Sequence, residues 1–426
     1  MSPAAELVID HLGSQGDGVA FAPDGPVYVP GAAPGDRVRA RWRPPAGAKA
    51  LPRAELLEVL APGPHRAQPA CRHFGSCGGC VAQHLDDALY ADWKRGLAGA
   101  ALDRVGLGAV PLDPLVRTPP GARRRVVWTA RRRRDGAVGL GYLARRSHHL
   151  VDIGACPILA PDLVALVAPL RVTLAELLAP GGAARLFATR TDGGIDLVIE
   201  WDRTAGLTER ETLAAFAQDR DLARLSLRDS ETAELDPILT RRAPVVRLAD
   251  LDLVVPPAPF LQASPVAEQA MADRVLAATE GAARVADLYA GCGAFALRLA
   301  RRGAAVTAVD GDPAALGALA AAARRAGLDR VTTEVRDLAR SPLAAQDLAQ
   351  FDAVVSDPPR AGARAQSVQL AASAVPVVVQ VSCQPATFAR DARILVDGGY
   401  RLQRVTPIDQ FLWAGHVELV GVFRRP

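Results

Sequence analysis

Hydrophobic and polar positions alternate in short runs near the start of the chain. Strand-like alternation occurs in five runs separated by Gly, Pro and Asp turns, namely Glu6–Ile9, Gly18–Ala22, Val27–Val29, Arg37–Trp42 and Ala54–Leu60. Five short strands are typical of an OB-like β-barrel, a frequent RNA-binding module, although such a barrel can also serve only to pack on its neighbours. We therefore expect a small barrel over residues 1–61.

The pattern changes further along the chain. Residues 84–105 repeat apolar side chains every four positions, which predicts a helix. Residues 117–260 are mixed, with strand-like runs at Arg125–Ala130, Leu186–Thr189 and Asp196–Trp201 and helical ones at Pro161–Leu178 and Leu207–Gln218. From about residue 265 strands and helices alternate, which predicts a doubly wound parallel sheet. Its expected strands are Arg284–Leu288, Ala305–Val309, Val331–Val335, Phe351–Val355, Val375–Val381, Tyr400–Pro407 and Val417–Phe423, with helices such as Pro313–Ala326 and Pro385–Leu395.

The final two expected strands are joined by only about nine residues, too few for a helical crossover, so they should pair antiparallel at one edge. An antiparallel hairpin ending a parallel sheet is the topology of class I methyltransferases. The predicted fold class is multidomain α/β, with the barrel at 1–61, a mixed α+β domain at 62–258 and a Rossmann-like domain at 259–426. We expect the segment at about 84–114 to pack with this last domain.

Composition limits the class of protein. The 426 residues are 50% hydrophobic and 23% charged, as expected of a folded multidomain chain. No stretch of about eighteen apolar residues occurs, and Met1–Glu6 lacks a basic region before an apolar core. We therefore expect a cytoplasmic protein with no membrane span, no secretory signal and no obligate protein partner.

Arginine dominates the basic residues. Only Lys49 and Lys94 are lysines among fifty basic side chains, an excess that a GC-rich genome alone would produce. Nine arginines nevertheless cluster at 123–125, 131–134 and 145–146, with Trp128 and Tyr142 interleaved. Guanidinium groups suit phosphates and aromatic faces suit unstacked bases, so this cluster predicts RNA contact, through Arg131, Arg132, Arg133 and Arg134 above all. The alternative is a solvated charged face.

Three cysteines, Cys71, Cys77 and Cys80, lie in a tight glycine-containing loop. In a reducing compartment, clustered cysteines indicate a metal or cluster site, which needs a fourth thiolate, and Cys156 is the next in sequence. Zinc and a [4Fe-4S] cluster both accept four thiolates, and the spacing leaves the two open.

A nucleotide site is predicted at the start of the parallel sheet. The run 287–295 places a Gly-x-Gly turn at the end of the first strand, and Asp310 ends the second, where a carboxylate can accept hydrogen bonds from ribose hydroxyls. Without a third glycine for phosphates, S-adenosylmethionine fits better than a dinucleotide. A Rossmann loop for another nucleotide is the alternative.

Two further motifs should meet at the carboxyl edge of the same sheet. Asp357 begins an Asp-Pro-Pro-Arg run whose Arg360 stands where amino-methylating enzymes carry an aromatic residue, and Cys383 ends the next strand. A thiolate that adds to C6 of uracil makes C5 nucleophilic enough to accept a methyl group, and a base must then remove the C5 proton. Glu418 is the expected base, with His416 or Asp409 as its neighbour.

These residues together resemble the RNA 5-methyluridine methyltransferases, from about Val8 onward. The resemblance implies a TRAM domain at the N-terminus, a [4Fe-4S] cluster on Cys71, Cys77, Cys80 and Cys156, Cys383 as nucleophile and Glu418 as base. It also implies contacts to S-adenosylmethionine from Gln262, Tyr289, Asp310 and Asp357, with Asp337 on the adenine side. Separately, we expect Arg360 to contact RNA.

Several positions depart from the family pattern, namely Ser264, Ala294, Gln384 and the run 412–415. These changes bear on substrate choice. A TRAM domain combined with a four-cysteine cluster resembles the 23S rRNA enzymes more than the tRNA T-loop enzymes, so 23S rRNA is the expected partner. The alternatives are a tRNA uridine-C5 enzyme, an RNA cytosine-C5 methyltransferase and a non-catalytic RNA-binding protein on the same scaffold.

Overall fold

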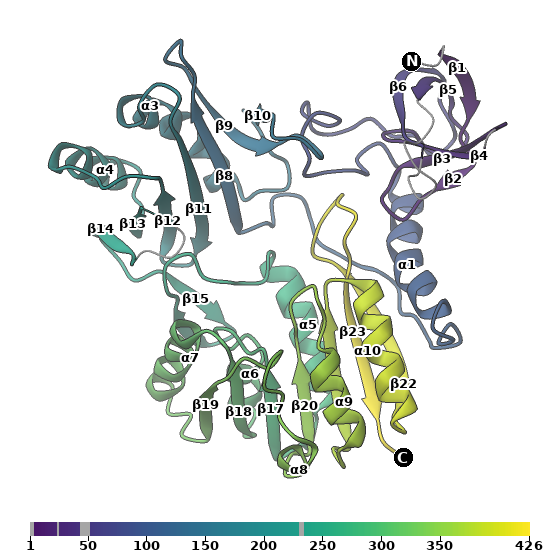
Figure 1. The fold of residues 1–426 in the computed structure, drawn as a ribbon. Helices are drawn as coiled ribbons and strands as arrows, with labels where there is room; N and C mark the ends of the chain where they lie inside the picture. Colours follow the sequence, from purple (N-terminus) through teal and green to yellow (C-terminus); the bar gives the residue numbers. More distant parts are fainter. Residues whose placement is uncertain (1–3, 24, 43–51, 230–233) are drawn as a thin grey trace.

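The computed structural model describes residues 4–23, 25–42, 52–229 and 234–426 (Figure 1). Lys49 and the first three residues, part of the segment expected to carry no secretory signal, lie outside these ranges. Within them, no helix has both the length and the apolar character needed to cross a membrane.

Two three-stranded sheets, ordered β1-β5-β6 and β2-β3-β4, form the N-terminal unit. Their strands are β1 (Ala5–Val8), β2 (His11–Leu12), β3 (Gly18–Ala22), β4 (Gly25–Val29), β5 (Arg37–Trp42) and β6 (Ala54–Ala61). Leu7, Val27 and Val38, from three different strands, share one buried core. All five predicted strands are confirmed, and β2, only two residues long, is additional.

Helix α1 (Asp87–Asp103) leaves the N-terminal unit and runs beside α10 (Pro385–Asp397) in Figure 1. It begins where the Asp86 carboxylate accepts a hydrogen bond from the Leu89 amide at 2.8 Å, a typical N-cap. Leu102 lies in the core shared with Phe388 and Leu419. Helix α1 therefore packs against elements of the C-terminal unit.

A seven-stranded sheet, ordered β10-β9-β8-β11-β12-β13-β14, forms the central unit. Its elements are β8 (Arg125–Arg132), β9 (Val138–Leu143), β10 (Leu150–Asp152), α2 (Pro161–Ala165), α3 (Val167–Leu177), β11 (Ala183–Thr191), β12 (Gly194–Glu200), α4 (Leu207–Asp219), β13 (Arg224–Arg228) and β14 (Asp236–Thr240). The single helix predicted at Pro161–Leu178 is wrong, because two helices meet at Leu166. Pro169 has no N–H to donate to the Ala165 carbonyl, so a continuous helix would lose a hydrogen bond there.

The C-terminal unit is built on an eight-stranded sheet. Its elements are α5 (Pro265–Ala278), β17 (Arg284–Leu288), α6 (Ala296–Arg301), β18 (Ala305–Asp310), α7 (Pro313–Arg325), β19 (Val331–Val335), α8 (Ala345–Leu348), β20 (Ala353–Ser356), α9 (Arg364–Ala372), β21 (Val377–Ser382), α10, β22 (Arg401–Asp409) and β23 (Glu418–Arg424). The hairpin β15 (Val245–Leu248) and β16 (Leu251–Val254) packs in the same core, through Val246 and Leu253. The packing of this unit therefore begins upstream of the boundary expected at residue 258.

The eight strands follow the order β19-β18-β17-β20-β21-β23-β22-β7. The first five are parallel, and β23 lies antiparallel between β21 and β22, which confirms the predicted antiparallel pairing. A short strand from far upstream, β7 (Val116–Arg117), adds parallel to β22, so β22 is not the edge strand. The sheet brings the carboxyl ends of β17, β18, β20 and β21 to one side, together with the first residue of β23.

Candidate active site

A tight turn follows β17. Tyr289 has a φ of +60° and Gly293 a φ of +90°, and a Cβ at Gly293 would lie 2.7 Å from the Leu319 side chain, so only glycine fits there. The amide of Gly291 donates to Asp310 Oδ2 at 2.8 Å, which fastens the turn to the end of β18. The predicted Gly-rich loop and its carboxylate therefore adjoin.

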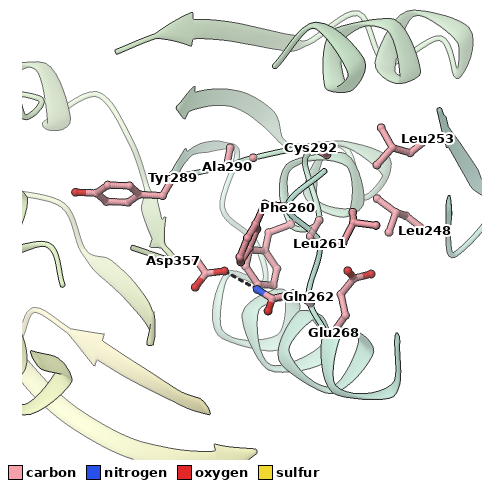
Figure 2. Close-up of a pocket in the computed structure, with 13 residues that line it drawn as sticks. Leu248, Leu253, Phe260, Leu261, Gln262, Glu268, Tyr289, Ala290, Cys292 and Asp357 are labelled. Atoms are coloured by element: carbon pink, nitrogen blue, oxygen red, sulfur yellow. Dashed lines mark hydrogen bonds between the residues drawn. The ribbon is translucent and has the colours of Figure 1, made fainter. Parts of the chain in front are cut away.

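Two cavities border this turn, and Tyr289 lines both. A small one of ≈ 30 Å³ is also lined by Gln262, Ala294 and Asp357. A larger one of ≈ 520 Å³ is lined by Leu338, Ala339 and the segment 361–365. Figure 2 shows the Gln262 amide pointing at the Asp357 carboxylate, a hydrogen bond of 2.7 Å.

Asp337 lies at the edge of this region. Its carboxylate accepts hydrogen bonds from the amides of Ala339 and Arg340, at 3.0 Å and 3.3 Å, and so shapes the loop that borders the larger cavity. The residues next to it, Leu338 and Ala339, supply the lining. Four of the five expected cofactor residues thus lie at the turn or the cavities, and Asp337 supports the wall of one.

Cys383, Glu418 and Asp357 meet at the carboxyl edge of the sheet. Asp357 follows β20 and Cys383 follows β21, while Ser382 pairs with Leu419 on the antiparallel strand β23. Because β23 runs the opposite way, its first residue reaches the edge at which β20 and β21 end. Cys383 is partly exposed, and Glu418 is buried.

These groups perturb one another electrostatically. Burial raises the pKa of Glu418 to about 8, and the nearby Asp357 charge adds to this effect. Burial and then the Glu418 charge raise the pKa of the Cys383 thiol to about 11. The Arg360 guanidinium opposes both shifts, because it favours the negatively charged forms. Arg360, predicted to contact RNA, is therefore also a cation whose charge lowers the pKa of both Glu418 and the Cys383 thiol.

The neighbours expected for Glu418 are wrong. Its carboxylate accepts a hydrogen bond from Gln410 at 2.8 Å. Asp409, one residue earlier, points the other way on β22 and pairs with Lys94 and Tyr90. His416 lies in the loop before β23, which begins only at Glu418, so the expected strand start at Val417 is one residue early. No spacing in the sequence singles out Gln410.

Lys94 is a second feature that the sequence analysis missed. It is completely buried on α1, lies 2.9 Å from Asp409 Oδ1 and donates to the carbonyls of Phe411 and His416. It therefore holds both ends of the loop between β22 and β23. The sequence offered one signal for a special role of Lys94: it is the single lysine on its helix, in a chain whose basic residues are almost all arginines.

The four predicted cluster cysteines line one cavity of ≈ 310 Å³. Burial raises the pKa of Cys80 to about 12 and also raises that of Cys77 and Cys156, and the other thiols of the set add to each shift. Amide N–H groups of His73 and Gly79 point at Cys71 and Cys77 sulfur atoms. In the described ranges, no three His, Cys, Asp or Glu side chains converge closely enough to hold one metal ion.

The arginine cluster divides into two sets. Arg131, Arg133 and Arg134 are exposed around the β8–β9 turn, as an RNA contact would require. Arg132 instead donates to the Leu178 carbonyl at 2.6 Å, and Arg124 is buried against Glu268, so these serve packing.

The interleaved aromatic residues are not available to bases. Trp128 is fully buried in the central core, and Tyr142 packs against that core and bonds to Cys156. The prediction that Trp128 stacks on bases is wrong, because alternate residues of β8 face inward. An exposed aromatic ring lies elsewhere: Phe260, 64% exposed, borders the small cavity and lies 4.5 Å from the Arg125 guanidinium.

Comparisons with known proteins agree with this geometry. A family profile described as tRNA (Uracil-5-)-methyltransferase matches residues 257–425. An uncharacterized RNA methyltransferase of Mesorhizobium japonicum is 44% identical over 99% of this chain and 98% of its own. A 23S rRNA (uracil(1939)-C(5))-methyltransferase of Chromohalobacter salexigens is 38% identical over 98% of this chain and 89% of its own.

A similar fold occurs in a solved structure. The tRNA (uracil-54, C5)-methyltransferase of Pyrococcus abyssi, in complex with S-adenosyl-L-homocysteine, superposes with a TM-score of 0.76 at 24% identity, covering 98% of this chain and 99% of that one. The likeness extends through the N-terminal units. That tRNA enzyme therefore shares the overall fold of this chain.

Proposed function

Because this chain belongs to the S-adenosylmethionine-dependent RNA (uracil-5-)-methyltransferases, we propose that it methylates a specific uridine through a covalent bond between Cys383 and C6 of the ring. The observation that carries the proposal is the meeting of thiol, Glu418 and Asp357 where β20 and β21 end and β23 begins. A nucleophile and a base at one sheet edge, beside a nucleoside-sized cavity, suit this reaction.

The reaction starts with the Cys383 thiolate. It adds to C6 of uracil, and the electron pair of the C5–C6 bond moves into the ring as an enolate. Bound S-adenosylmethionine would supply an electrophilic methyl group: as C5 bonds to the methyl carbon, the bond from that carbon to the sulfonium sulfur breaks, and S-adenosylhomocysteine is the leaving group. Glu418 then accepts the C5 proton, the C5–C6 double bond re-forms, and the thiolate leaves. The Cys383 thiolate is thus regenerated, and the proton remains on Glu418 until solvent removes it.

The perturbed groups suit these roles. A base with a pKa of about 8 is partly ionised near neutral pH and holds the proton firmly once it has taken it. The thiol pKa of about 11 means that the thiolate needs stabilisation, which the Arg360 charge favours. We propose Arg360 as a group that both stabilises the thiolate and meets the RNA backbone.

For the methyl donor we propose the two cavities that share Tyr289. The backbone turn and Asp310 would face the ribose, and Gln262 and Asp357 would hold the methionine part. Leu338 and Ala339, supported by Asp337, would border the adenine in the larger cavity. This division follows from the sheet, because a nucleoside cofactor bound at the carboxyl edge would lie across the ends of β17 and β18.

The proposed RNA partner is 23S rRNA, on the support of the 38% identical relative that acts on it. We propose that the N-terminal sheets are a TRAM domain and that Arg131, Arg133 and Arg134 contact phosphates. Phe260 and Arg125, next to the small cavity, offer a stacking face for an unpaired base. A tRNA uridine remains the second candidate, since the Pyrococcus fold serves one.

The methylation proposal is tested with Cys383→Ala and Glu418→Gln. We expect C383A to lose methyl transfer while it still binds S-adenosylmethionine, and E418Q to stall as a covalent RNA adduct that denaturing gels detect. Asp352→Asn, a carboxylate at the opposite end of β20, is the matched control. Nucleoside mass spectrometry separates uridine from cytidine products, and mapping in a deletion strain identifies the RNA. A C383A enzyme with full rate refutes the mechanism.

We also propose that Cys71, Cys77, Cys80 and Cys156 hold a [4Fe-4S] cluster. Four thiols around a cavity of ≈ 310 Å³ leave room for several metal and sulfide atoms, whereas a single zinc ion sits only about 2.3 Å from each thiolate. Buried thiols with raised pKa values need cations to exist as thiolates, which iron supplies.

The cluster proposal predicts a brown protein whose absorbance at about 400 nm is lost with Cys71→Ser. Cys292→Ser, which changes a free cysteine in the C-terminal unit, should keep the colour. Colourless protein that carries zinc after anaerobic purification would contradict this proposal.

A further inference from the structure

Gln410 joins the proposed base to the proposed donor site. It follows β22 directly and is 5% exposed. Its amide oxygen accepts from the Ala263 N–H at 2.7 Å, and its Nε2 lies 2.8 Å from both Gln262 Oε1 and Glu418 Oε2. The side chain therefore bonds to three partners on two separate segments.

The orientation of this amide is fixed by its partners. The Ala263 N–H can only donate, so the Gln410 oxygen must face it and the NH₂ group must face Glu418. The second N–H then goes to Gln262 Oε1, which turns the Gln262 NH₂ toward Asp357. The two carboxyl groups, Asp357 and Glu418, are thus linked through two amides of defined direction.

We propose that Gln410 is a positioning residue for proton removal, which holds Oε2 of Glu418 so that the other carboxylate oxygen faces C5 of the covalently bound uracil. This inference rests on the proposed uracil chemistry. Gln410 does not touch the ring; it acts through Glu418 by restricting the carboxylate to one orientation and by donating to its charged form. Gln410 therefore serves the last step, in which the adduct is resolved.

The charges around Glu418 show why such a donor is needed. Burial and the Asp357 charge favour the protonated acid, and the Cys383 thiolate is a further negative neighbour. The Gln410 hydrogen bond and the Arg360 charge work in the opposite direction and lower the pKa of Glu418. Without Gln410 the base is both less ionised and free to rotate, so removal of the C5 proton should slow more than thiolate addition.

The experiment compares Gln410→Met with wild type and with a matched control. Methionine has a similar length but no N–H to donate. Gln366→Met is the control, because Gln366 is also buried and its amide bonds to the Leu343 backbone, at 2.9 Å and 3.1 Å. Each protein is incubated with S-adenosylmethionine and with RNA carrying either uridine or 5-fluorouridine at the target.

With uridine RNA, we expect Q410M to accumulate about tenfold more covalent adduct on denaturing gels than wild type, the scale of one charge-assisted hydrogen bond. Its turnover should fall by about the same factor, and its rate should reach half-maximum at a higher pH than wild type does. Binding of S-adenosylmethionine, measured by equilibrium dialysis, should stay within about twofold, and Q366M should match wild type.

The 5-fluorouridine RNA separates the two proposals. Fluorine at C5 leaves no proton to remove, so wild type and Q410M should be trapped equally. Failure of wild type to form this adduct overturns the covalent mechanism and this inference with it. If wild type is trapped but Q410M shows no excess adduct with uridine, or loses S-adenosylmethionine binding instead, Gln410 is not a positioning residue for the base.

Discussion

Replacing Lys94 with methionine should destabilise the C-terminal unit strongly. Lys94 and Asp409 are both completely buried and lie 2.9 Å apart, and Tyr90 donates to the same carboxylate at 2.7 Å. Methionine fills similar space but leaves the Asp409 charge without its cation. It also removes the hydrogen bonds to the Phe411 and His416 carbonyls, which hold the loop before Glu418.

The expected loss of stability can be estimated. Removing one partner of a buried ion pair costs about 3–5 kcal/mol, because the remaining charge stays desolvated. Replacing both partners is often nearly neutral, so K94M/D409N should be more stable than K94M alone. The matched control is the ion pair between Asp87 (84% exposed), at the start of the same helix, and Arg117 on β7, and Asp87→Asn should cost under about 1 kcal/mol.

Urea unfolding followed by tryptophan fluorescence measures these differences, since Trp93 and Trp413 adjoin the network. At a slope of about 3 kcal/mol per molar urea, K94M should lower the midpoint by about 1 M or more. If K94M shifts the midpoint no more than D87N does, or if D409N adds its full cost on top of K94M, the buried pair does not stabilise the fold.

Further predictions concern charge. Because Glu418, with a pKa of about 8, and the Cys383 thiol, with a pKa of about 11, both act when deprotonated, the methyl-transfer rate should rise with pH from about 7 to 9, and a rate that falls over this range would exclude them. The raised pKa also means that folding stability contributed by protonated Glu418 falls as pH rises from about 4 to about 8, a slope that E418Q should reduce in unfolding titrations. Replacing the exposed Arg133 and Arg134 with glutamine should make RNA affinity less sensitive to salt. In a plot of log affinity against log salt concentration, the slope should fall by up to about one for each phosphate that is no longer neutralised, and the stability of the protein should not change. Arg132→Gln should instead lower the melting temperature, because it removes the hydrogen bond to Leu178.

Local patterns determined much of the fold. Alternation identified the five N-terminal strands, and the order of strands and helices predicted the parallel sheet with its antiparallel final pair. Short-range signals succeed where a strand forms an uninterrupted buried run, as in β20 and β21, in which every residue is buried. They failed where a proline interrupts a helical pattern, as Pro169 does, and where an element is only two residues long, as β2 and β7 are.

The candidate chemistry was also visible in the sequence, since motifs at strand ends placed Cys383, Glu418 and Asp357 at one edge of the sheet. The sequence did not reveal which groups each of these side chains contacts. Trp128 was expected to meet bases, and its place in the core depends on which face of β8 is turned inward.

The sequence by itself determined the element order, the strand-end motifs and the set of cysteines, because these depend on residues near one another in the chain. Only the tertiary structure decided that Gln410 bonds to Glu418 and that Lys94 on α1 holds the β22–β23 loop. Lys94 and Asp409 are over three hundred residues apart in sequence. The contact between Lys94 and Asp409 forms because separate units of the chain pack together. The direction in which one side chain points toward another follows no repeat or spacing that can be read from the sequence.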